Sequence, residues 1–84
     1  MTVVETAEVV SLVMLERARQ EELRREGSLE YTAADPDCPD VLRLAALVEE
    51  IGEVARALHD ADFDNLAEEL VQVAAVAVAW REAL

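Results

Sequence analysis

The fold is decided by the stretch LVQVAAVAVAW at residues 70–80, in which Gln72 is the only polar residue. A helix of this composition is apolar on nearly all sides and has to be buried on most of them. Two further helices in a chain of 84 residues are too few to surround it, so we expect a second copy of the chain to complete the bundle. Symmetry favours a homodimer, and a homotetramer stays open.

Gln72 interrupts this apolar stretch and therefore says something about its surroundings. A buried amide that finds no hydrogen-bond partner costs roughly 1–3 kcal/mol. We therefore expect other polar side chains in the interior beside Gln72.

Outward from this stretch, the apolar periodicity predicts two more helices and no strand. The predicted fold is all-α, with three helices per chain in a bundle completed by homo-oligomerisation. It forms a single domain over residues 1–84, with helices at about 6–26, 40–59 and 65–83 and a loop at 27–39. The first helix is apolar in its first half and charged in its second, so we expect it to dock by one end and project the other.

Glycine, proline and capping residues set the predicted limits of these helices. Gly27 ends the first helix, and the loop that follows contains both prolines of the chain. Asp37 or Asp40 is the expected N-cap of the second helix. Asn65 and Glu68 have the spacing of a capping box at the start of the third.

The second helix carries one apolar stripe with a spacing of 3.6 residues. The stripe consists of Leu44, Leu47, Val48, Ile51, Val54, Ala55 and Leu58. Successive residues turn by 100° around a helix, and on this geometry Glu50 lies about 100° from the centre of the stripe.

The net charge of −12 arises from 19 acidic residues and 7 arginines, and the chain has no lysine. Such a chain repels phosphate backbones and anionic membrane surfaces, so we expect neither nucleic acid nor membrane as a partner. The acidic excess either keeps the protein soluble or binds divalent cations. Cys38 is the only cysteine and the first ten residues lack a basic segment, which together favour the cytoplasm.

The acidic residues form two groups at helical spacing. Glu49, Glu50 and Glu53 share one side of the second helix, and Glu68 and Glu69 lie beside Gln72 on the third. Carboxylates that face each other repel unless a cation lies between them, and Mg²⁺ or Mn²⁺ prefers such oxygen ligands. The alternative is structural, because Glu favours helices and acidic residues in a first turn favour the helix dipole.

Two segments resemble the MazG-like nucleoside triphosphate pyrophosphohydrolases. The segment LVEEIGEVARAL at 47–58 is similar to the E-E-x-x-E element of that family, and EELVQV at 68–73 is similar to its E-x-x-D element. The resemblance covers roughly residues 16–84. It implies a helical dimer or tetramer that hydrolyses a nucleoside triphosphate to the monophosphate and pyrophosphate with Mg²⁺.

The resemblance also assigns roles to individual residues. It implies that Glu50, Glu53 and Glu69 bind the metal and that Glu49 acts with Glu50 in catalysis. The last family position is Asp, and here it is Gln72. An amide offers a metal only its carbonyl oxygen, so Gln72 is predicted to bind substrate instead, with the orientation of a water molecule as the alternative.

A phosphate-binding cation must be an arginine in this chain, because it has no lysine. Arg17 and Arg56 are the predicted substrate-binding cations, and Arg24 is a third candidate. Solvation at the surface is the alternative for all three.

A non-catalytic module is the competing interpretation of the whole chain. Gln72 and the shortness of the chain favour a helical oligomerisation domain, or a sensor that binds nucleotide or metal without turnover. The sequence leaves open the preferred base and sugar of the nucleotide.

Overall fold

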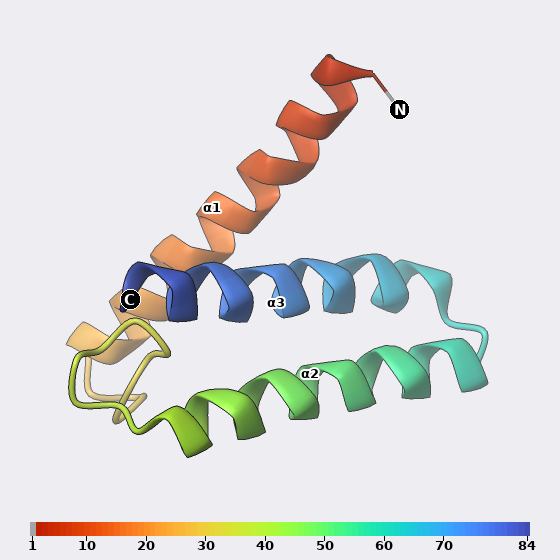
Figure 1. Cartoon of the computed structure of the whole chain (residues 1–84). Helices are drawn as coiled ribbons and strands as arrows, with labels where there is room; N and C mark the ends of the chain where they lie inside the picture. Colours follow the sequence, from red (N-terminus) through yellow and green to blue (C-terminus); the bar gives the residue numbers. More distant parts are fainter. Residues whose placement is uncertain (1) are drawn as a thin grey trace.

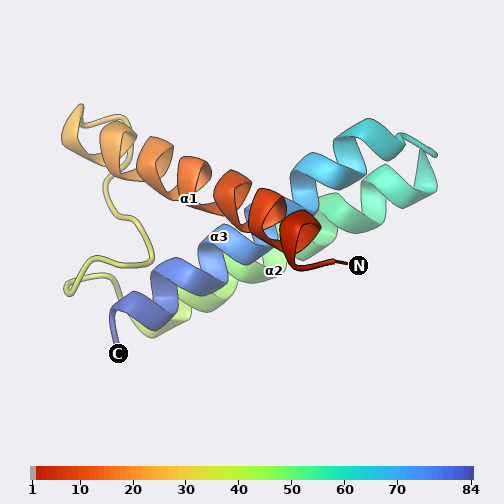
Figure 2. The ribbon, with the colours of Figure 1, turned by 90° about the horizontal axis from the view of Figure 1, so that it is seen from above.

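The computed structural model describes residues 2–84, which contain three α-helices and no strand, so the all-α prediction is confirmed. The helices are α1 (Val3–Arg25), α2 (Asp40–His59) and α3 (Phe63–Glu82). α2 and α3 run antiparallel side by side, and α1 crosses α3 on the side away from α2 (Figures 1 and 2). α3 therefore lies between the other two helices and contacts both.

α1 begins three residues earlier than the sequence analysis placed it, because Thr2 forms a capping box. The Thr2 hydroxyl accepts a hydrogen bond from the Glu5 amide at 3.2 Å, and the Glu5 carboxylate accepts one from the Thr2 amide at 2.9 Å. This reciprocal pair satisfies two amides that a helix start leaves without partners.

Two of the other predicted caps are wrong. Pro39 is the N-cap of α2 and makes no side-chain cap, so Asp40 lies inside the first turn, where its charge favours the helix dipole. α3 begins at Phe63 rather than at Asn65, because the Asp62 carboxylate accepts the hydrogen bond of the Asn65 amide at 3.2 Å.

The C-termini of α1 and α2 end in the same way, with a residue of positive φ after the cap. Gly27 (φ 82°) follows α1, as expected, and Ala61 (φ 51°) follows α2. In each case the amide of the next residue donates a hydrogen bond to a carbonyl five residues back, from Ser28 to Leu23 and from Asp62 to Ala57. Both ends are Schellman motifs, and α2 forms its motif without a glycine.

The interface between the helices is built from small side chains. Ala57 of α2 and Ala75 and Ala79 of α3 are each at most 1% exposed, and Val13 and Val76 are buried beside them. Alanines at these positions let the helix backbones approach closely, but they bury little apolar area.

Most of the apolar stripe of α2 lies on the outside of the chain, and only Leu47 and Val54 at its edge are partly buried. Leu44, Val48, Ile51 and Leu58 are each about half exposed. The face of α2 toward α3 carries Arg43, Ala46, Glu50 and Ala57 instead, which are buried or partly buried. We call the exposed apolar row the outer stripe and define it as Val41, Leu44, Val48, Ile51, Ala55 and Leu58.

α1 docks by its middle, where the apolar half meets the charged half and where its buried residues Val13, Glu16 and Arg17 lie. Its apolar first half projects beyond the helix pair (Figure 1). Val9, Val10 and Leu12 on this half are each about half exposed. None of the three helices is long and apolar enough to cross a membrane.

Candidate functional site

Two acidic side chains meet where α2 and α3 face each other. Glu50 is at the centre of the α2 face toward α3, within about 40° of the buried Arg43 and Ala57 around the helix. The carboxyl group of Glu69 on α3 lies in hydrogen-bonding contact with it. Burial, this contact and the negative charges of Glu69, Glu49 and Glu53 together raise the pKa of Glu50 from 4.5 to about 7.

The other predicted acidic residues surround this pair. Glu53 is partly buried and acts on Glu50 through its charge, and Glu49 and Glu68 are exposed. In residues 2–84, no three histidine, cysteine or acidic side chains converge closely enough to hold a metal ion. The structure therefore brings together Glu50 and Glu69, two of the three predicted ligands, and leaves Glu53 at a distance in this conformation.

A cavity of about 260 Å³ adjoins Glu50. α1, α2, α3 and the loop before α2 all line it, and its polar lining includes Glu50, Gln72 and Arg19. The loop contributes Tyr31 and the buried Thr32. Gln20 of α1 adds a second amide. An aromatic ring, two amides, a cation and a carboxylate thus share one small cavity, which is the kind of lining that fixes the orientation of a polar ligand.

Gln72 has the polar surroundings that its place in an apolar helix required. It is partly buried on the face of α3 that carries Val76 and Ala79. Gln72 also borders a second cavity of about 390 Å³ between α1 and α3. It lines this cavity with Glu16 of α1 and helps to lower the pKa of that carboxyl group. Gln72 of the central helix therefore lines both cavities.

Glu16 and Arg19 also border the site, although no sequence motif points to them. Glu16 is buried, and its carboxylate accepts hydrogen bonds from Arg19 Nε at 2.7 and 2.9 Å. The Arg19 hydrogen bond holds the pKa of Glu16 below its usual value, against the effect of burial, and Gln72 contributes in the same direction. Their spacing of three residues marks them as a possible helix pair. Which side of α1 faces α3 depends on tertiary packing.

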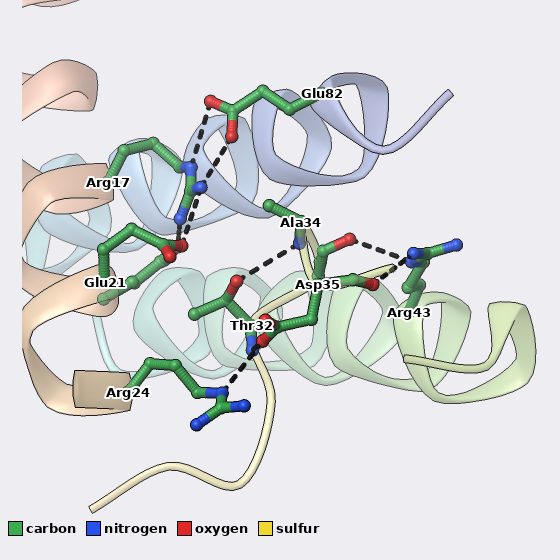
Figure 3. A network of polar contacts seen from close by, with 10 residues as sticks. Arg17, Glu21, Arg24, Thr32, Ala34, Asp35, Arg43 and Glu82 are labelled. Carbon is green, nitrogen blue, oxygen red and sulfur yellow. Dashed lines mark hydrogen bonds and ion pairs between the residues drawn. The ribbon is translucent and has the colours of Figure 1, made fainter. Parts of the chain in front are cut away.

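Arg17 and Arg56, the two arginines predicted to bind substrate, do not line the cavity beside Glu50. Arg17 is buried and donates to Glu82 at the end of α3 (Nη2 to Oε2, 2.7 Å), and it forms an ion pair with Glu21 at 2.9 Å (Figure 3). It does not line the cavity beside Glu50; it holds α1 against the end of α3. Arg56 is exposed on α2 and forms no ion pair with any residue of the range 2–84.

Polar contacts fix the loop that forms one wall of the cavity. Arg43 is buried and donates to the carbonyl oxygens of Ala33 at 2.8 Å and Asp35 at 2.7 Å (Figure 3). The Asp35 carboxylate accepts from the Thr32 amide at 2.6 Å and from Arg24 at 3.2 Å. Arg24 therefore fastens the loop and does not point to the cavity.

One comparison with known proteins gave a match. The family model described as "MazG nucleotide pyrophosphohydrolase domain" matches residues 41–82, which is half of the chain and contains both acidic segments. No curated protein and no solved structure matches the chain.

Proposed function

The chain belongs to the MazG nucleotide pyrophosphohydrolase family, and on this premise we propose that it hydrolyses a nucleoside triphosphate to the monophosphate and pyrophosphate with Mg²⁺. In this reaction water breaks the bond between the α- and β-phosphoryl groups. Little covalent chemistry is left to the protein, so positioning and neutralisation of charge supply most of the rate.

The observation that carries this proposal is the contact between Glu50 and Glu69 at the edge of a polar cavity. Burial is the largest cause of the raised pKa of Glu50, and the Glu69 carboxyl group adds to it, because two carboxyl groups this close repel each other when both are ionised. A divalent cation removes that repulsion, so the pair fits a hard metal ion. Glu50 and Glu69 would hold Mg²⁺, with Glu53 one helical turn along α2 as a further ligand.

A Mg²⁺ ion held by these residues would supply charge neutralisation for the triphosphate. The chain itself supplies the remaining groups. Glu49 is exposed to water beside the pair, and we assign it to accept the proton of the attacking water. Gln72 lines the cavity from α3 as a neutral polar group.

The test is pyrophosphate release from a panel of ribo- and deoxynucleoside triphosphates in the presence of Mg²⁺. Glu50→Gln removes one carboxylate of the pair and should reduce the rate by at least about a hundredfold. Glu68→Gln is the matched control, because Glu68 is an exposed acid next to Glu69 in sequence and outside the pair. Nucleotide binding without turnover in the wild type would instead identify a sensor. The absence of both binding and turnover would leave only an assembly domain.

We also propose that the chain functions as a homo-oligomer whose subunits cover the outer stripe. The single chain exposes 5893 Å², against about 4,900 Å² for a folded monomer of 9.2 kDa. The excess of roughly 1,000 Å² is comparable with the 800 Å² that each partner buries in a standard interface. A second copy carries the same apolar faces and is the simplest partner that covers them.

A further inference from the structure

The cavity beside Glu50 contains one cation among the described residues that line it, and that cation is Arg19. We propose that Arg19 binds the phosphate groups of the substrate and that Gln72 is a positioning residue, which acts on Arg19 through the carboxylate of Glu16. This inference rests on the proposed hydrolysis and assigns a phosphate-binding side chain to it. It also gives Gln72 a role other than that of a metal ligand.

The geometry of Arg19 favours such a role. The Glu16 carboxylate accepts from Arg19 Nε at 2.7 Å and lies 2.6 Å from Arg19 Nη2, so one edge of the guanidinium is held by two contacts. Glu16 is 93% buried at its side chain, whereas the Arg19 side chain is 60% exposed. A buried anchor thus holds an exposed cation in one orientation, and its Nη1 donates to no residue of the described range.

An ordinary surface ion pair has a different geometry. Arg25 and Glu22 on the same helix have the same spacing, but both side chains are more than half exposed and line neither cavity beside Gln72. Arg19 lines both of these cavities. Because an anionic ligand beside Glu50 and Glu69 needs positive charge on its other side, the position of Arg19 matches the substrate's charge.

Gln72 completes the anchor from the central helix. Gln72 lines the cavity between α1 and α3 together with Glu16 and Arg19. Its amide helps to keep the pKa of the Glu16 carboxyl group, which holds Arg19, below its usual value. Asp or Glu at position 72 would set a second carboxylate against Glu16, and the two would repel each other or share a proton. The amide is therefore the side chain that this network requires, which accounts for Gln at a position where the E-x-x-D element ends in Asp.

The first experiment measures binding of inorganic tripolyphosphate with Mg²⁺ by calorimetry, together with kcat and KM for the best nucleotide. Arg19→Gln should weaken tripolyphosphate binding and raise KM by roughly tenfold or more, with a smaller change in kcat. Arg19→Lys should recover only part of the loss, because an ammonium lacks the planar fork of arginine. Arg25→Gln is the matched control and should bind as the wild type does.

The Glu16→Gln/Arg19→Gln double variant guards against a folding artefact, since it removes the cation without leaving a buried carboxylate alone. It should melt within a few degrees of the wild type and bind tripolyphosphate as weakly as Arg19→Gln. Wild-type affinity in this double variant would overturn the assignment of Arg19.

The second experiment tests Gln72. Gln72→Asp and Gln72→Glu should raise KM and weaken tripolyphosphate binding, and Glu16→Gln combined with Gln72→Glu should restore both by exchanging the amide and the carboxylate. A gain of activity and of Mg²⁺ affinity in Gln72→Asp would show that position 72 is a metal ligand and would overturn the positioning role.

These outcomes separate the two proposals. Pyrophosphate release with wild-type binding in the Arg19 and Gln72 variants would sink this inference and leave the hydrolase standing. Tripolyphosphate binding that depends on Arg19 and Gln72, without any turnover of nucleotide, would sink the hydrolase and leave the phosphate-binding role of Arg19 standing. Neither binding nor turnover in the wild type would remove both.

Discussion

Glu50 of α2 and Glu69 of α3 place their carboxyl groups in contact across two antiparallel helices, and this contact makes the metal-free protein sensitive to pH. The pKa of Glu50 is raised from 4.5 to about 7, so between these values the folded chain binds more protons than the unfolded chain. The free energy of unfolding therefore falls as pH rises through this window. The pKa values of Glu16 and Asp35 are lowered from 4.5 and 3.8, so both groups are ionised in the folded and the unfolded chain over most of this window. They therefore add little to this pH dependence.

We predict that the protein in EDTA melts at a lower temperature at pH 8 than at pH 5.5, as measured by circular dichroism. Glu50→Gln should flatten this dependence and melt above the wild type at pH 8, because it removes the ionised carboxylate that the pair cannot accommodate. An equal slope in the variant would show that the pair does not control it.

Mg²⁺ should reverse the loss of stability that ionisation of the Glu50–Glu69 pair causes at high pH. We expect Mg²⁺ to raise the melting temperature at pH 8 and to do so much less at pH 5.5, where protons compete for the pair. Glu69→Gln should remove most of the stabilisation, and Glu68→Gln should retain it. Equal stabilisation of both variants would indicate that Mg²⁺ binds elsewhere on this acidic surface.

The sequence predicted the helices better than it predicted their orientation. Gly27 and the loop prolines separate α1 from α2, and the apolar stretch at 70–80 requires a helix, so local chemistry determines these features. The periodicity of α2 identified an apolar stripe but not the side on which it lies. The chain turns a neighbouring face, with Arg43 and Glu50, toward α3 and leaves most of the stripe exposed.

The site shows the same division. The resemblance of two motifs to the family selected Glu50 and Glu69 together with Glu53, and the structure brings the first two close to each other. Arg19 was missed because its role depends on which side of α1 docks, and no local pattern specifies that side. Arg17 was selected as a substrate-binding cation, but in the structure it is one of the residues that dock α1, through Glu82.

At the two Schellman motifs, we predict that replacing glycine by alanine lowers the free energy of unfolding and that replacing alanine by glycine raises it. Gly27 has φ 82°, and a Cβ there would touch nothing, so Gly27→Ala should cost about 1 kcal/mol from backbone strain alone. Ala61 has φ 51° and already carries that strain, so Ala61→Gly should stabilise the protein by up to about 1 kcal/mol. Urea denaturation measures both. Destabilisation by Ala61→Gly would mean that flexibility gained in the unfolded chain outweighs the relieved strain.

The outer stripe of α2 predicts how assembly can be disrupted. Ile51 lies at the middle of the outer stripe and is 52% exposed. Ile51→Glu should shift the oligomer toward the monomer in sedimentation equilibrium, because it places a charge in an apolar interface. Leu84→Glu adds the same charge at the end of the chain, where Leu84 is 80% exposed, and should leave the mass unchanged. If Ile51→Glu has the same mass as the wild type, the outer stripe does not form the interface.

Arg43 predicts how the wall of the cavity can be loosened. Its guanidinium donates to the Ala33 and Asp35 carbonyls from a buried position, so Arg43→Met leaves both without this donor and should lower the free energy of unfolding by about 2–3 kcal/mol. Residues 28–39 should then become a site of early cleavage in limited proteolysis. Arg81→Met is the control, because Arg81 is exposed and pairs with no acid of residues 2–84, and it should change stability by less than about 0.5 kcal/mol. Equal effects of the two substitutions would show that the loop is held by its own turns and that the cavity wall does not depend on Arg43.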